Sequence, residues 1–146
     1  MTRAMLIGMI AATLLPHLSH VVQQPAPAGA VYIAYYWHAK PGQLDAYNEY
    51  IRTVAVPIDE DARKAGVFEE VRTVMPGPGI AADWTHLRIF RLKEGLNHAA
   101  AAQALSAGLD AATARVVPDE AQRKANTARA SGLRDFVRQE TWIELR

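Results

Sequence analysis

The sequence predicts a mixed α+β fold in which helices cover one face of a four-stranded antiparallel sheet. Three observations lead to this prediction: a β-rich run over residues 31–39, a helical period that starts at Leu44, and two further strand-like runs joined by a Pro-Gly loop. A second helical region and a short C-terminal strand complete the order β-α-β-β-α-β. The domain is expected to span residues 31–146.

The first strand is predicted over Val31–Ala39, because this run is rich in Tyr, Trp and Ile. Lys40-Pro41-Gly42 ends it, since proline has no backbone donor for the sheet and glycine allows a turn.

An amphipathic helix is predicted from residue 44 to residue 65. Its apolar residues recur at intervals of three and four: Leu44, Tyr47, Ile51, Val54, Ile58, Ala62 and Ala65. Pro57 should kink this helix or restart it, and Gly66 stands where a helix commonly ends.

The second strand is predicted over Phe68–Met75, and the third runs from Asp83 or Trp84 to Leu92. The sequence "PGPG" at residues 76–79 opens the loop between them, so the two strands form a hairpin.

An alanine-rich helix follows over residues 96–116 and is broken at Pro118. A last helix is expected to begin there, with an apolar side formed by Leu133, Phe136 and Val137, and Thr141–Leu145 is the predicted final strand.

Right-handed crossovers place the first and third strands in the centre of the sheet, between the fourth and the second, in a ferredoxin-like arrangement. Two sets alternate along the first strand: Ile33, Tyr35, Trp37 and Ala39 on one side, and Tyr32, Ala34, Tyr36 and His38 on the other. Neither side resembles a solvated surface. The face without helices therefore needs an apolar cover, and the sequence predicts a homodimer paired through these sheet faces.

Residues 1–30 predict a signal peptide and a short linker. One arginine precedes an apolar run from Ala4 to Leu15, which is broken at Pro16 and is too short to span a bilayer. Ala28-Gly29-Ala30 resembles a cleavage site, although the position of the cut is open. The alternative is a short N-terminal helix that stays with the domain. Export predicts a periplasmic or secreted protein with no membrane attachment after the signal is removed.

Composition excludes several classes of function. The chain has 146 residues, with 16 basic and 15 acidic side chains, and this balance argues against a nucleic-acid binder. The absence of cysteine excludes a disulfide framework and a thiol nucleophile.

Three stretches of this sequence resemble the dimeric α/β barrel proteins: "YYWHAKPGQLDAYNEYI", "DWTHLRIFRL" and "TWIEL". That group includes antibiotic-biosynthesis-type monooxygenases, EthD-like proteins and stress-responsive barrel proteins. The resemblance implies two sheets packed face to face, with a pocket between sheet and helices in each subunit. It also implies chemistry without a cofactor, because the Asn/Trp/His set of the haem-degrading members has no match here.

Antiparallel pairing predicts a cluster of candidate site residues at one end of the sheet. The start of the third strand should lie beside the end of the first, which brings Trp84 and His86 near His38. Trp142, at the start of the predicted fourth strand, should arrive at the same end. The candidates are His38 and His86 as acid–base groups, Arg88 for an anion, and Tyr35, Tyr36, Trp84 and Trp142 as pocket walls.

The sequence thus predicts an exported dimer that binds a small aromatic or hydrophobic molecule and is capable of transforming it without a cofactor. The rival hypothesis is a periplasmic ligand-binding or structural dimer with no turnover, in which His86 makes a core hydrogen bond and the aromatic rings fill the interface. An accessory role in a membrane complex would require the leader to remain as an anchor. No metal is predicted, since His38 and His86 lack a third ligand at a recognisable spacing.

Overall fold

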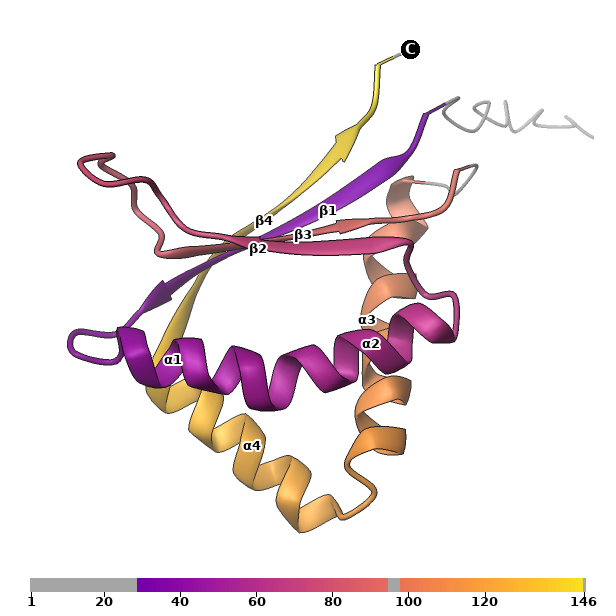
Figure 1. Cartoon of the computed structure of the whole chain (residues 1–146). Coiled ribbons are helices and arrows are strands. Elements are labelled where there is room, and N and C mark those ends of the chain that lie inside the picture. Colours follow the sequence, from indigo (N-terminus) through magenta and orange to yellow (C-terminus); the bar gives the residue numbers. More distant parts are fainter. Residues whose placement is uncertain (1–28, 95–97, 146) are drawn as a thin grey trace, which may run out of the picture.

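A four-stranded antiparallel sheet runs through the part of the chain that the structure, a computed structural model, describes: residues 29–94 and 98–145 (Figure 1). The strands are β1 (Val31–Ala39), β2 (Glu70–Val74), β3 (His86–Arg91) and β4 (Arg134–Ile143). Their order is β2-β3-β1-β4, so β1 and β3 lie in the centre, as predicted.

Helices lie on one face of this sheet, below the strands in Figure 1. They are α1 (Leu44–Tyr50), the π-helical turn η1 (Ile51–Ala55), α2 (Val56–Lys64), α3 (His98–Val116) and α4 (Glu120–Leu133). We call this side of the sheet the helix face and the opposite side the open face. None of the helices described is long and apolar enough to cross a membrane.

The first helical segment follows its predicted stripe but is not uniform. Pro57 occupies the first turn of α2, where its missing N–H is not needed, and the π-helical turn η1 comes directly before α2. Gly66 has a φ of 76°, which a residue with a side chain rarely adopts, and it follows the helix end as predicted.

The second and third strands are shorter than predicted, and the fourth is much longer. The prediction was wrong for Phe136 and Val137, which belong to β4 and not to the last helix. Their three-residue and four-residue distances from Leu133 imitate a helical stripe, but α4 ends at Leu133 and β4 pairs with β1 over its whole length. A nine-residue central strand needs a partner of similar length to satisfy its backbone groups.

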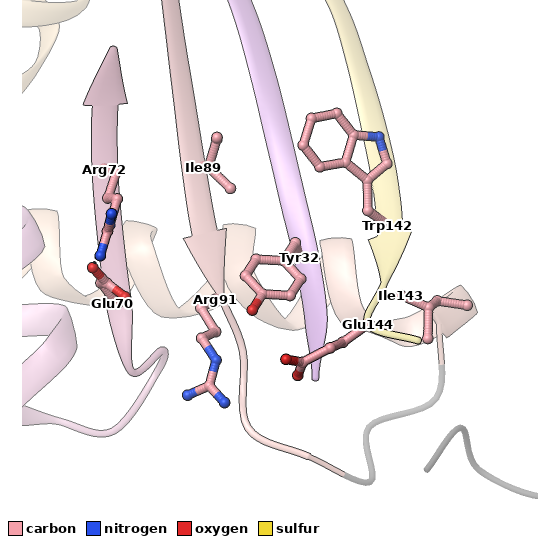
Figure 2. A pocket seen from close by; sticks show the side chains of 8 residues that line it. All are labelled: Tyr32, Glu70, Arg72, Ile89, Arg91, Trp142, Ile143 and Glu144. Atoms are coloured by element: carbon pink, nitrogen blue, oxygen red, sulfur yellow. Dashed lines mark hydrogen bonds and ion pairs between the residues drawn. The ribbon is translucent and has the colours of Figure 1, made fainter. Parts of the chain in front are cut away.

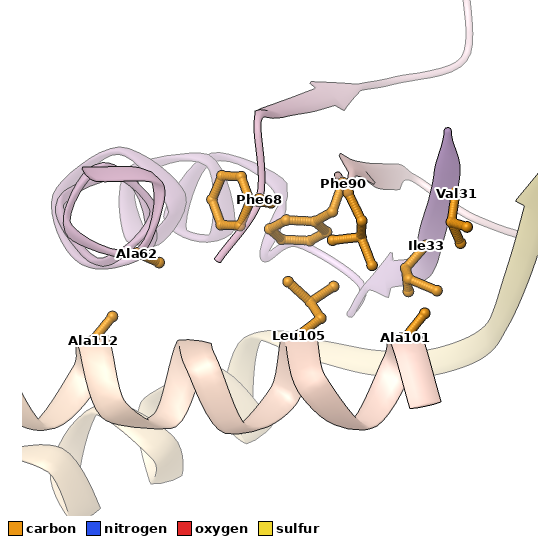
Figure 3. Packing of buried hydrophobic residues seen from close by; sticks show 9 residues of the cluster. Val31, Ile33, Ala62, Phe68, Phe90, Ala101, Leu105 and Ala112 are labelled. Carbon is orange, nitrogen blue, oxygen red and sulfur yellow. The ribbon is translucent and has the colours of Figure 1, made fainter. Parts of the chain in front are cut away.

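The main core fills the space between the helix face, α2 and α3 (Figure 3). Val31, Ile33 and Phe90 of the sheet pack there against small and apolar side chains of the helices. Gly108 of α3 allows a close approach, because a Cβ at this position would lie 2.3 Å from Cγ1 of Val67. The alanine-rich sequence of α3 thus serves tight packing on the sheet.

Two residues before β1 also pack with the sheet. Ala30 is fully buried, and its carbonyl accepts a hydrogen bond of 3.0 Å from the backbone N–H of Glu144. A Cβ on Gly29 would lie 2.3 Å from the carbonyl oxygen of Glu144. The rest of the predicted signal peptide, residues 1–28, and the first two residues of the helix predicted over residues 96–116 lie outside the described residues.

Candidate functional site

The two faces of the sheet separate the predicted site residues. In the register of β1 with β3, Trp37 is opposite His86 and Tyr35 is opposite Arg88, so Tyr35, His86 and Arg88 share the helix face. Tyr36 is opposite Leu87 on the other face, where Trp84 packs edge-on against its ring at 5.7 Å. The predicted single cluster is therefore not formed.

His38 and His86 are not brought together. His86 is opposite Trp37 and thus lies on the other side of the sheet from His38, which follows the alternation of Tyr36. The His38 side chain is exposed, with Nδ1 3.2 Å from the carbonyl oxygen of Asp83. The prediction brought the correct strand ends together, but the two imidazoles lie on opposite sides of the sheet.

Trp142 lies at the other end of the sheet from His38. Because β4 begins at Arg134 and not at Thr141, Trp142 is near the end of the strand, opposite Tyr32 at the start of β1. The prediction that Trp142 joins His38 and Trp84 was wrong for this reason.

His86 is held on both ring nitrogens by the protein itself. Its Nε2 is 2.9 Å from Oδ1 of Asn48 on α1, and its Nδ1 is 2.9 Å from the hydroxyl of Thr85. The side chain is 1% exposed, and its burial, with the nearby charge of Arg134, lowers the pKa to about 4. The amide oxygen of Asn48 only accepts, so the neutral imidazole donates from Nε2 and accepts at Nδ1. This arrangement joins β3 to α1.

Arg88 forms a buried ion pair with Asp59 of α2. The two side chains are 12% and 8% exposed, and the guanidinium also lies 5.1 Å from the ring centre of Phe90. Burial raises the pKa of Asp59, and the charge of Arg88 opposes this shift. The Nε of Arg88 is buried and has no hydrogen-bond partner among the described residues.

Arg88 also lines a cavity of about 240 Å³ between the sheet and α3, which we call the helix-face cavity. Its lining residues are Tyr35, Trp37, Arg88, Phe90, Ser106, Leu109, Asp110 and Arg134. Tyr35 and Arg88 are the predicted site residues that it contains. Burial raises the pKa of Tyr35.

Arg134 is the functional candidate that the sequence prediction missed. Its guanidinium stacks 3.6 Å from the ring centre of Trp37 and donates a hydrogen bond of 2.7 Å to the hydroxyl of Tyr47. Within the part of the chain that the structure describes, no carboxylate forms an ion pair with it. The signal that could have revealed Arg134 was the alternation of side chains along β4, but the sequence prediction treated this part of the chain as helix.

The open face carries a larger groove of about 470 Å³, shown in Figure 2. The groove is lined by Tyr32, Glu70, Arg72, Ile89, Arg91, Trp142, Ile143 and Glu144. Both arginines of the groove are already engaged, because Arg72 pairs with Glu70 at 2.5 Å and Arg91 pairs with Glu69. The groove therefore offers apolar surface more than unpaired charge.

The centre of the open face is covered by side chains of its own strands. The guanidinium of Arg138 lies 3.9 Å from the ring centre of Tyr36, whose hydroxyl donates to Glu140 at 2.9 Å. Arg138 also pairs with Glu140 and with Asp83, both at 2.9 Å. Tyr36 is consequently 5% exposed and forms part of this cover rather than the wall of an open pocket. No group of three histidine, aspartate or glutamate side chains that could hold a metal occurs in residues 29–94 and 98–145.

Comparison with known proteins supports the fold and extends no further. No family model and no curated protein matches the sequence. The structure is similar to the crystal structure of HapK from Hahella chejuensis, with a TM-score of 0.52 and 11% sequence identity. The similarity covers 79% of this chain and 92% of HapK. At this identity it shows a shared ferredoxin-like α+β fold, in agreement with the four-stranded antiparallel sheet and its helices.

Proposed function

We propose that the helix-face cavity binds a small aromatic or hydrophobic molecule, and that the protein acts as an exported homodimer paired through its open faces. The observation that supports binding is a cavity with aromatic walls between sheet and helices, lined also by two arginines. Export rests on the sequence of residues 1–30.

The walls of the cavity suit a flat apolar ligand. Tyr35 and Phe90 meet edge to face at 5.9 Å on neighbouring strands, and Trp37 continues the aromatic surface along β1. Leu109 of α3 also lines the cavity. The volume of about 240 Å³ equals that of roughly eight water molecules, at about 30 Å³ each, which corresponds to a molecule with one ring.

Binding without turnover is the second candidate function, and the state of the histidines favours it. Both ring nitrogens of His86 have protein partners, and His38 is exposed on the other side of the sheet. Acid–base catalysis by these two residues has little geometric support, since a general base needs a free nitrogen within reach of its substrate.

Filling the cavity tests the binding site. Leu109→Trp should abolish binding of single-ring aromatic compounds, measured as the rise in Tm that each compound causes. For a compound at about a hundredfold excess over its Kd, the rise in the parent protein should be about 10 °C. Ile80→Trp is the matched control, because Ile80 is 66% exposed and lies outside the cavity. Compounds that still raise the Tm of the Leu109→Trp protein would place the binding site elsewhere.

A further inference from the structure

We infer that the ligand of the helix-face cavity is a single-ring aromatic carboxylate, whose anionic group is held by Arg134, with Arg88 in the lining of the same cavity. The inference rests on the proposed function, because it names the class of molecule that the same cavity binds.

Arg134 is a fixed cation with no anionic partner among the described residues. Stacking on Trp37 and the hydrogen bond to Tyr47 fix the position of the guanidinium, so little conformational freedom remains to be lost when a ligand binds. The side chain is half-buried, and no acidic residue among those described lies within ion-pairing distance. A guanidinium in such a place matches the planar geometry of a carboxylate.

Arg88 adds a second guanidinium to the lining of the same cavity. Asp59 accepts from one terminal nitrogen of Arg88, whereas the buried Nε–H has no acceptor among the described residues. This Nε has almost no accessible surface, so a ligand in the cavity would meet the charge of the guanidinium and not this donor. A carboxylate would therefore accept hydrogen bonds from Arg134.

The other charges at the cavity do not favour a cationic ligand. Asp59 is already paired with Arg88, and Asp110 on α3 is exposed to solvent, which screens its charge. An amine would bring its positive charge toward two guanidinium groups in a partly buried place. The ring of the ligand would pack against Tyr35 and Trp37, which line the cavity beside the arginines.

Calorimetry with benzoate, benzamide and benzylamine tests the inference, because these probes share a ring and differ in charge. The parent protein should bind benzoate about tenfold more tightly than benzamide, and benzylamine more weakly still. Arg134→Gln should reduce benzoate binding to the level of benzamide and leave benzamide binding unchanged. Arg129→Gln is the control, since Arg129 stacks on Tyr50 at 5.7 Å and does not line the cavity.

A measurement on the parent protein keeps the test independent of any effect of Arg134→Gln on folding. A tenfold increase in salt concentration should weaken benzoate binding and leave benzamide binding nearly unchanged. Equal affinity for benzoate and benzamide, or a preference for benzylamine, would overturn the inference while leaving a ligand site in the cavity. Failure of all three probes to bind would overturn both the inference and the proposed function.

Discussion

At the scale of single residues, the structure assigns opposite environments to two histidines of one sheet. His86 is buried between Asn48, Thr85 and Tyr47, whereas His38 is exposed beside Asp83. The sequence could predict both as candidates, since histidine is the side chain that commonly titrates near neutral pH. It could not predict which side of the sheet each would occupy, because that depends on a one-residue difference in register.

The buried state of His86 predicts that the protein loses stability in mild acid. Its pKa is about 4 in the folded protein and about 6.5 when unfolded, so between these values the unfolded chain binds the proton and the native chain does not. Stability should be full above about pH 6.5 and should fall toward pH 4, by up to about 3 kcal/mol from this group. Urea unfolding at several pH values measures the effect.

The matched variants are His86→Gln and His38→Gln. The first should flatten the decline between about pH 6.5 and 4, since glutamine does not titrate. The second should retain it, because the His38 side chain is exposed and makes one contact with a backbone carbonyl. A decline that is unchanged in His86→Gln would show that other groups cause it.

At the scale of elements, β1 and the first helical segment could be predicted because their local signals agree with their surroundings. The aromatic and β-branched run of β1 matches its bounds, and Pro57 and Gly66 occupy the helix positions expected of them. The boundary between α4 and β4 could not be predicted, because helical spacing from Leu133 to Val137 competes with the strand pairing that β1 requires. Arg134 lies at this boundary, so its position in β4 was not predicted either.

Gly108 in α3 and Gly132 in α4 have different surroundings, so replacing each with alanine should have opposite effects on the free energy of unfolding. Gly108→Ala should destabilise the protein by about 1–3 kcal/mol, because the added Cβ would lie 2.3 Å from Cγ1 of Val67. Gly132→Ala in α4 has nothing within 4 Å and should stabilise it by up to about 1 kcal/mol. Denaturant unfolding compares the two. Adding Val67→Ala should recover part of the loss in Gly108→Ala, and a Gly108→Ala protein as stable as the parent would contradict this packing.

At the scale of the whole molecule, the open face predicts the oligomeric state. With about 3.3 Å per residue and about 4.8 Å between strands, the sheet has a footprint of roughly 500 Å², below the roughly 800 Å² per partner of a standard interface, so a dimer would also use residues beyond the strands. Val74 and Trp142 contribute apolar surface to this face, at 40% and 41% exposed, and its acidic and basic groups occur in pairs. A second copy would therefore meet a surface of mixed charge and apolar rings.

Light scattering on the chain from Gly29 onward should show a dimer. Trp142→Glu should raise the dissociation constant about tenfold or more, because it places a charge in the apolar groove. Val56→Glu is the control, since Val56 is 39% exposed on α2, on the helix face. A parent protein that remains monomeric at high concentration would contradict the homodimer.

Gly29 and Ala30 both contact Glu144, so the two possible sites of signal cleavage would affect the domain differently. Cleavage after Ala30 would remove a buried residue and the carbonyl that accepts from Glu144, so the first and last strands would lose their outermost bond. Cleavage after Ala28, where Ala26-Pro27-Ala28 also has small residues at the required spacing, would leave that bond in place. The two products differ by Gly29 and Ala30, so the mass of the secreted chain tells them apart.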